Sequence, residues 1–282
     1  MRSVDPRLRL ASAVLCLSCA WSVLAQDASP GATPAGAAKP DAANPRQSGT
    51  PGQTEVAASY SREWLKYNPD DWIDTRVEAL HKFADRALIT GAATESQRYG
   101  LRDTTASLGG YYPLAARTTV YAEVAASGTH RVLPKDSEYL QLTQSFGTGW
   151  GVLAGYKHVD YNSTKVEIGD LTLEKYFSSY RAAFTAFPSH SSTAGNAASY
   201  RLQLSAYYGE NEQSNVQVVL VKGTEVDKPT GIDQVVATSV KSGALFGRHW
   251  LHRSWSLTWS VGRTLQETAT RNSASVGLRY RF

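Results

Sequence analysis

Residues 274–282 read ASVGLRYRF, and this stretch decides the fold. The side chains of an extended strand alternate between its two faces. One face therefore carries Ala274, Val276, Leu278, Tyr280 and Phe282, and the other carries Ser275, Gly277, Arg279 and Arg281. The first face suits lipid and the second suits water. The stretch is typical of the closing strand of a bacterial outer-membrane β-barrel, and we expect Leu278, Tyr280 and Phe282 to form its assembly signal.

The first 25 residues have the organisation of a secretory signal peptide, which predicts export from the cytoplasm. A basic start precedes an apolar run over residues 10–23, and Val23-Leu24-Ala25 provides the small residues that a signal peptidase requires. The run is shorter than the ~18 to 20 residues of a membrane-spanning helix. Both cysteines, Cys16 and Cys19, lie inside this peptide. We therefore expect no disulfide and no Cys-ligated metal site after cleavage.

Composition divides the rest of the chain into two parts. Residues 26–54 are rich in Ala, Pro, Gly, Ser and Asp, which predicts a disordered linker. Residues 55–282 consist of segments of about ten residues with period-two patterning, as in an all-β, antiparallel, up-and-down transmembrane barrel. We interpret this pattern as about fourteen strands. One of the clearest segments sets Trp255, Leu257, Trp259 and Val261 against Ser254, Ser256, Thr258 and Ser260.

The lengths of the predicted links indicate how the barrel is oriented. Tight links at residues 84–85, 147–149 and 209–211 alternate with longer links at 128–136, 188–196 and 223–233. Outer-membrane barrels place short links in the periplasm and long loops outside, so we expect both termini in the periplasm. Twelve strands are an alternative, because the pattern changes phase at Gly169-Asp170, which indicates a bulge, and because residues 248–253 could form a long turn.

The overall composition agrees with a barrel and argues against nucleic-acid binding. Fifteen Tyr, seven Trp and twenty-two Gly favour strands, interfacial aromatic side chains and tight turns. The mean hydropathy of -0.33 is also that of a soluble protein, and a soluble β-sandwich would show the same alternation. Such a sandwich would not place Trp and Tyr so often at the ends of the apolar face. The net charge of +4 is spread without a basic stripe, so nucleic acid is not an expected partner.

Several blocks of the sequence resemble one family of bacterial barrels. They are YSREWL from residue 60, DWIDTRVEALHKF from residue 71, GTGWGVLAGYKHVDYNSTKVEIGDLTLEKYFSSYRAAFTAF over 147–187, SYRLQLSAYYGE from residue 199 and SVGLRYRF over 275–282. On these blocks residues 60–282 are similar to the YaiO-type outer-membrane β-barrel family. The resemblance implies an integral outer-membrane location and a role beside exopolysaccharide or other envelope-glycan systems, and it carries no catalytic motif. Several members have a helical repeat domain ahead of the barrel, where this chain has only the linker.

The polar faces of the predicted strands give the candidate site. Charged side chains of both signs are expected to line the lumen, namely Glu123, Lys157, Glu174, Arg181, Arg201, Arg279 and Arg281. Fixed charges tune the selectivity of a pore, and Tyr121 and Tyr207 could stack on sugar rings. Alternatively, the charges pair across the interior and stiffen the barrel.

From these features we expect an outer-membrane pore, or an accessory, for the passage of envelope glycan (exopolysaccharide) or small solutes. We expect no catalytic residue, no metal and no cofactor. The expected partners are outer-membrane lipid and lipopolysaccharide, the barrel-assembly machinery and components of glycan export.

Two other functions are kept as alternatives. A surface receptor or adhesion protein would use its long loops, first of all residues 223–233, GTEVDKPTGID. A hydrolase at the rim that modifies lipid would need a catalytic cluster, and the best candidate is His158 with Asp160 and Ser163. The spacing of these three residues is not that of a recognised motif, so we do not expect an enzyme.

Overall fold

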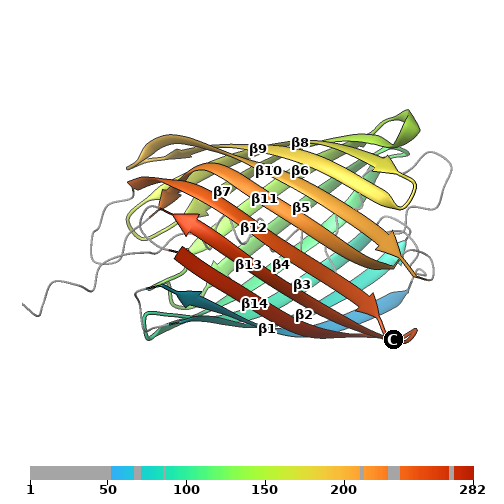
Figure 1. Ribbon diagram of the computed structural model, residues 1–282, viewed down its shortest axis with the longest axis horizontal. Coiled ribbons are helices and arrows are strands. Elements are labelled where there is room, and N and C mark those ends of the chain that lie inside the picture. The colour runs from blue at the N-terminus through green and yellow to red at the C-terminus, as the bar shows by residue number, and fades with distance from the viewer. Residues whose placement is uncertain (1–51, 67–70, 85–86, 210–212, 228–235, 267–269) are drawn as a thin grey trace, which may run out of the picture.

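The computed structural model describes residues 52–66, 71–84, 87–209, 213–227, 236–266 and 270–282. Within these ranges the chain forms fourteen antiparallel strands that close into one barrel, with a single 3-10 turn at Gly147–Gly149 (Figure 1). The strands are β1 (Gln53–Leu65), β2 (Trp72–Ala84), β3 (Ala87–Arg98), β4 (Leu101–Ala115), β5 (Thr118–Ser127), β6 (Asp136–Ser145), β7 (Trp150–Asp160), β8 (Lys165–Phe177), β9 (Tyr180–Ser191), β10 (Gly195–Tyr208), β11 (Ser214–Asp227), β12 (Val236–Trp250), β13 (Trp255–Gln266) and β14 (Thr270–Arg281).

The topology is up-and-down, because every strand pairs with its neighbours in the sequence and β1 pairs with β14. The closing pair runs from Glu55 opposite Arg281 to Leu65 opposite Arg271. Closure leaves no edge strand with unpaired backbone groups, which is the condition for a sheet to cross a bilayer. The prediction of fourteen strands is confirmed. The alternative of twelve strands is wrong, since β12 continues to Trp250 instead of ending in a long turn.

The bulge predicted at Gly169-Asp170 is wrong. Strand β8 keeps one register with β7 throughout. The pattern changes there because Val166 and Ile168 face the interior and pack with Val159 and Tyr161, so the apolar residues switch faces while the backbone does not. Register shifts occur instead between Lys82 and Ala84 and between Pro113 and Ala115.

The links define two ends of the barrel. We call the end where β1 begins and β14 ends the near end, and the opposite end the far end. The longest far-end links are 66–71, 128–135 and 228–235, whereas 85–86, 116–117 and 178–179 are short near-end links. The alternation is partial, because the far-end link 99–100 is also short. The long loop predicted at 188–196 is wrong. Strand β9 continues to Ser191 and β10 begins at Gly195, and the side chains of His190 and Asn196 form a 2.8 Å hydrogen bond across this pair.

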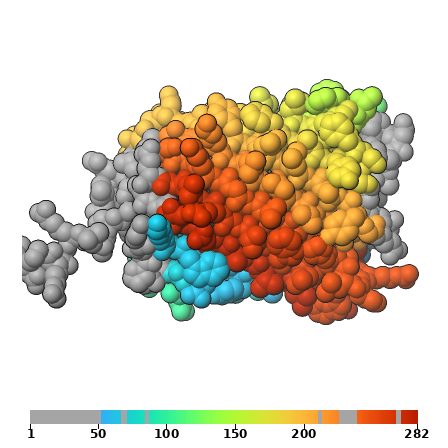
Figure 2. Space-filling view, viewed as in Figure 1, coloured from blue at the N-terminus to red at the C-terminus, as the bar shows by residue number. Residues whose placement is uncertain are grey.

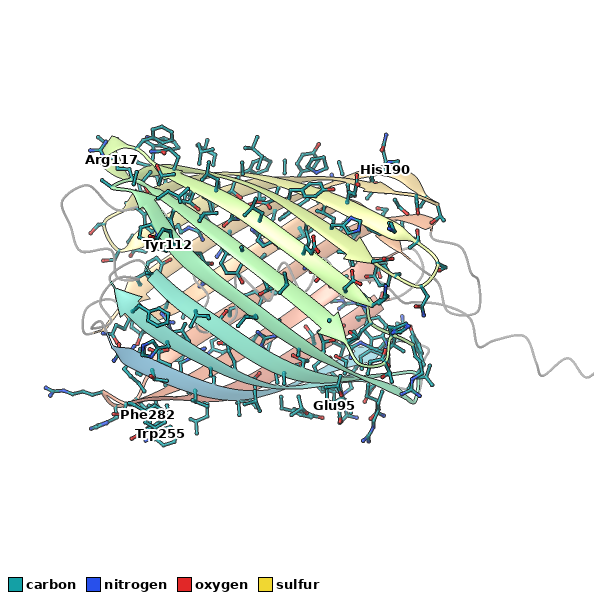
Figure 3. All side chains as sticks on the ribbon, turned by 180° about the vertical axis from the view of Figure 1, so that it is seen from behind. Glu95, Tyr112, Arg117, His190, Trp255 and Phe282 are labelled. Atoms are coloured by element: carbon teal, nitrogen blue, oxygen red, sulfur yellow. The ribbon has the colours of Figure 1, made fainter. Side chains whose placement is uncertain are left out.

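The outer wall of the barrel is apolar. Figure 2 shows side chains of the strands covering this wall in a continuous layer. Exposed aromatic side chains gather at the near end, and Figure 3 shows Tyr112, Trp255 and Phe282 there, with Glu95 and His190 toward the other end. Aromatic residues at the margin of an apolar band are typical of a barrel in a bilayer. No helix in the described ranges is long and apolar enough to span a membrane.

The inner wall is mostly polar. Most buried side chains are Ser, Thr, Gln, Arg and acidic residues, and the apolar clusters among them are small. The predicted signal peptide, residues 1–25, and nearly all of the predicted linker, residues 26–54, lie outside the described residues. The barrel itself begins with β1 at Gln53, two residues before the predicted boundary at 55.

Candidate functional site

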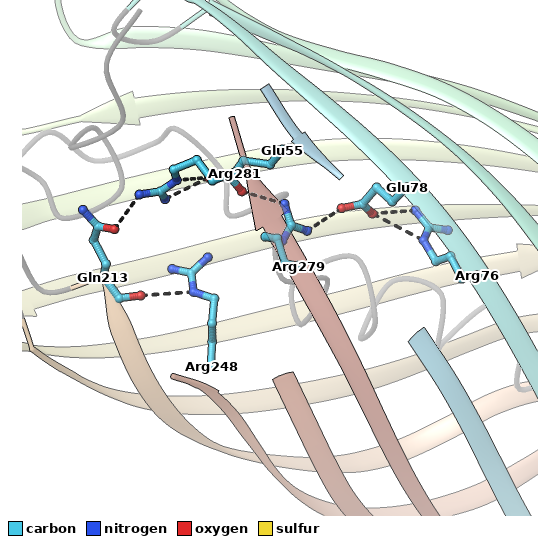
Figure 4. Close-up of polar contacts among 7 residues, drawn as sticks. All are labelled: Glu55, Arg76, Glu78, Gln213, Arg248, Arg279 and Arg281. Carbon is cyan, nitrogen blue, oxygen red and sulfur yellow. Dashed lines mark hydrogen bonds and ion pairs between the residues drawn. The ribbon is translucent and has the colours of Figure 1, made fainter. Parts of the chain in front are cut away.

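A chain of charged side chains crosses the interior at the near end (Figure 4). Arg279 donates to Glu55 at 2.8 Å and to Glu78 at 2.7 Å. Arg281 donates to the other oxygen of Glu55, at 2.8 Å, and to Oε1 of Gln213, also at 2.8 Å. These contacts join β14 to β1, to β2 and to the link before β11. Two of the seven residues proposed from the sequence, Arg279 and Arg281, therefore lie in one network.

Two more arginines extend this network. Arg76 on β2 contacts Glu78 at 3.0 Å, and Arg248 on β12 donates to the backbone carbonyl of Gln213 at 3.1 Å. Counted over the described residues, the network holds four guanidinium groups and two carboxylates, Glu55 and Glu78. Arg281 also lies over the ring of Trp250, with its Cζ 3.7 Å from the ring centroid. Among the described residues of this network, cationic charge is in excess, and it faces the lumen.

Arg181 and Glu174 form a second, separate pair near the same end. Arg181 donates from Nε to Oε2 of Glu174 at 2.7 Å, and the two side chains are 3% and 1% exposed. Arg201 lies farther along the wall, where its Nη2 contacts the hydroxyl of Thr185 at 3.3 Å and its guanidinium lies over Phe187 at 5.0 Å. These residues are distributed along the wall and do not converge on one point.

A row of tyrosines lines the wall formed by β4, β5 and β6. The Tyr111 and Tyr121 rings are 4.3 Å apart and the Tyr121 and Tyr139 rings 5.8 Å apart, measured between centroids. The predicted Glu123 accepts a 2.7 Å hydrogen bond from Tyr121, and Asp170 accepts one of 2.9 Å from Tyr139. Both predicted tyrosines are inside, and Tyr207 packs with Tyr176. The predicted Lys157 is also buried in this interior.

A loop at the far end is tied to an inward carboxylate. Asp103 on β4 accepts hydrogen bonds from the backbone nitrogens of Val132, at 2.6 Å, and Leu133, at 3.0 Å. The hydroxyl of Thr129 adds a third, at 2.7 Å. Val132 and Leu133 are 2% and 8% exposed, so this loop, residues 128–135, packs against the interior side of the mouth. Sequence reasoning missed Asp103, although its inward position follows from the alternation along β4.

A second cluster missed from the sequence lies at the same end. The guanidinium groups of Arg98 on β3 and Arg271 on β14 lie 4.9 and 4.8 Å from the ring centroid of Trp72 on β2. Arg98 pairs with Asp74 at 2.8 Å, whereas Arg271 approaches Glu63 only at 3.6 Å. Within the described residues, no nitrogen of the Arg271 guanidinium has a hydrogen-bond partner, and the side chain is 1% exposed.

In the part of the chain that the structure describes, the three residues of the possible catalytic cluster are not joined to one another. His158 and Asp160 occupy alternate positions on the outer face of β7, and no hydrogen bond in the described ranges joins His158 to Asp160 or to Ser163. His249 lies on the outer face of β12, where it accepts a 2.7 Å hydrogen bond from Trp259 and contacts Tyr208. The receptor loop proposed at 223–233 belongs to β11 up to Asp227, and the rest lies outside the described residues.

Comparison with known families gives one match. The model of the family described as "YaiO membrane beta barrel domain" matches residues 53–228, which is more than half of the chain. No match was found among curated protein sequences.

Solved structures of outer-membrane barrels match this chain. A bacterial polysaccharide outer membrane secretin is 12% identical with a TM-score of 0.55, covering 83% of this chain and 100% of that one. The outer membrane protein Omp33 of Acinetobacter baumannii is 12% identical with a TM-score of 0.49, covering 83% and 100%. The KdgM porin is 11% identical with a TM-score of 0.42, covering 80% and 99%. At 12% identity the likeness to the secretin concerns the fold alone.

Proposed function

This chain belongs to the YaiO membrane β-barrel family, and from that premise we propose that it is an outer-membrane pore for envelope glycans or small solutes. The near end would face the periplasm, in keeping with the expected position of both termini. The assignment to glycans rests on the family resemblance. The polysaccharide secretin has a similar barrel, and this likeness supports the fold that the proposed pore requires.

The excess of cationic charge at the near mouth carries the proposal. Among the described residues, the basic side chains on the inner wall there are Arg76, Lys82, Arg181, Arg248, Arg279 and Arg281, and the carboxylates are Glu55, Glu78 and Glu174. Fixed charges inside a low-dielectric wall concentrate ions of the opposite sign. Anionic solutes, such as a sugar chain that carries carboxylates, are therefore favoured at this mouth.

The test is the ion selectivity of the purified protein in a planar bilayer. We expect discrete conductance steps and, under a salt gradient, a reversal potential that indicates preference for the anion. Arg248→Gln combined with Arg281→Gln removes two interior cations, and it should shift the reversal potential toward cation preference. Arg117→Gln is the matched control, because Arg117 is an exposed arginine in the near-end link outside this network.

Sugars distinguish a glycan pore from an ion pore. An oligosaccharide with carboxylates should lower the open-channel current more strongly than a neutral oligosaccharide of the same length. A barrel that migrates as a folded protein without heating and passes no current would overturn the pore. Equal block of the current by the two sugars would overturn the preference for anionic sugars, while the proposal of a sugar-admitting pore would stand.

A further inference from the structure

Three basic side chains form a patch on the outer wall toward the far end. Lys222 on β11, Lys241 on β12 and Arg263 on β13 are all exposed, and the three strands lie side by side at the front of Figure 1. Lys222 pairs directly with Lys241. Lys241 pairs with Leu265, two residues from Arg263. Direct cross-strand neighbours have Cβ atoms about 5 Å apart and diagonal neighbours about 7 to 8 Å apart, so these long side chains are within reach of one ligand.

This arrangement of like charges contrasts with other charges on the far half of the outer wall. Arg62 is paired with Asp71, and Lys165 lies 3.9 Å from Asp160. Within the described residues, no ion pair involves Lys222, Lys241 or Arg263. Like charges placed directly opposite in a sheet destabilise the pair. The arrangement is therefore suited to an anion that comes from outside the chain.

The outer wall next to the patch, on its near-end side, is apolar. Leu220 precedes Lys222 on the same face of β11, and Leu245 and Val261 continue this surface on β12 and β13. The three residues are 50%, 41% and 47% exposed. Gly243 lies between Lys241 and Leu245 on β12 and adds no side chain to this surface. An added Cβ there would meet only Leu220, at an ordinary 3.5 Å, so packing within the chain does not require a glycine. A ligand with anionic groups above and hydrocarbon chains below matches this surface.

We propose that Lys222, Lys241 and Arg263 bind the phosphate groups of lipid A, the membrane anchor of lipopolysaccharide, while its acyl chains lie over Leu220, Leu245 and Val261. Two phosphates on one headgroup match a cluster of three cations better than the single phosphate of a phospholipid does. The far end is the end that we expect to face outward, and lipopolysaccharide occupies the outer leaflet. This site is separate from the lumen, so it stands whether or not the barrel conducts.

The experiment measures binding of lipid A to the intact protein purified in detergent. The ligands are bisphosphorylated lipid A, dephosphorylated lipid A and phosphatidylglycerol. Each basic residue near a membrane surface strengthens binding of anionic lipid about five-fold, so Lys222→Gln with Lys241→Gln and Arg263→Gln should weaken binding of lipid A roughly a hundred-fold. Dephosphorylated lipid A should bind the unaltered protein as weakly as lipid A binds this triple variant.

Two matched variants complete the design. Lys165→Gln removes an exposed far-end lysine that lies beside Asp160, and it should leave the affinity unchanged. Lys222→Arg with Lys241→Arg keeps both charges and should retain binding. Equal affinity of the triple variant and the unaltered protein, with heat-modifiable migration showing that both are folded, would overturn the site. Equally tight binding of phosphatidylglycerol, lost in the triple variant, would overturn the assignment to lipid A.

Discussion

Arg279 on β14 donates a 2.8 Å hydrogen bond from Nη1 to Oε2 of Glu55 on β1, across the seam where the barrel closes. The two residues are 224 positions apart in the sequence. Both side chains are nearly buried, at 1% and 10% exposure, and Arg279 reaches onward to Glu78 on β2. The seam is therefore held by buried charge in addition to the backbone hydrogen bonds between β1 and β14.

Removing the carboxylate at this seam should destabilise the barrel strongly. Glu55→Gln leaves Arg279 and Arg281 buried with less compensating charge, and breaking a buried pair in this way costs about 3 to 5 kcal/mol. The free energy of unfolding can be measured by urea titration in lipid vesicles, with heat-modifiable migration as the readout. Adding Arg279→Gln to Glu55→Gln should recover part of the loss. Arg62→Gln, which breaks an exposed pair with Asp71, should cost at most about 1 kcal/mol.

The tyrosine row depends on a glycine that leaves it room. A Cβ on Gly155 would collide with the carboxylate of Asp170 and would lie 2.8 Å from the hydroxyl of Tyr139. Gly155→Ala should therefore break the hydrogen bond between Tyr139 and Asp170, at a cost of about 1 to 3 kcal/mol. Gly91→Ala is the control, because a Cβ there meets only a backbone oxygen at 3.9 Å. Similar unfolding free energies for the two variants would contradict this role of Gly155.

Releasing the far-end loop should alter both its protease sensitivity and the conductance. Asp103→Ala removes the acceptor for the Val132 and Leu133 nitrogens, so residues 128–135 lose their attachment to the interior wall. We expect faster trypsin cleavage after Arg131 and larger conductance steps. The fragment masses identify the cleavage site. Glu95→Ala, on the outer face of β3, should change neither quantity, and an unchanged cleavage rate in Asp103→Ala would argue against the attachment.

The buried pair of Arg271 and Glu63 should contribute little net stability. The guanidinium lacks hydrogen bonds among the described residues and lies 3.6 Å from the carboxylate, so the pairing offsets little of its desolvation. Either single variant, Arg271→Met or Glu63→Gln, should destabilise the barrel because it leaves one buried charge. The double variant should unfold with a free energy equal to or above that of the unaltered protein. A double variant clearly less stable than the unaltered protein would show that the pair is stabilising.

Much of the inner wall was predictable from alternation. Arg279 and Leu278 had to face opposite sides, and the same reasoning placed Glu123, Arg181 and Arg201 on the polar face. Trp72 and Asp103 were missed although the same signal was present: each alternates with outward residues of its strand, as Trp72 does with Ile73. Each is an isolated aromatic or acidic residue at a strand end, and no motif in the sequence distinguishes it as a functional residue.

The errors came from treating local polarity as backbone geometry. Val166 and Ile168 are apolar and face inward, so the apolar face changed sides without a bulge at Gly169-Asp170. The segment 188–196 contains Pro, Ser, His and Asn, which are typical of loops. There, however, the backbone pairing of β9 with β10, which extends to Ser191 opposite Gly195, continues the hairpin. Pairing with a neighbouring strand decided both cases.

The sequence by itself determined the class of fold and the face on which each strand residue lies, because the pleat of a strand is a local property with a period of two. Only the tertiary structure decided which charged side chains meet and what they contact. Barrel closure fixes the register of every pair, and the register brings Glu55 to Arg279, Asp103 to the 128–135 loop and Lys222 to Lys241. Those relationships depend on the positions of many strands at once, and no single segment contains them.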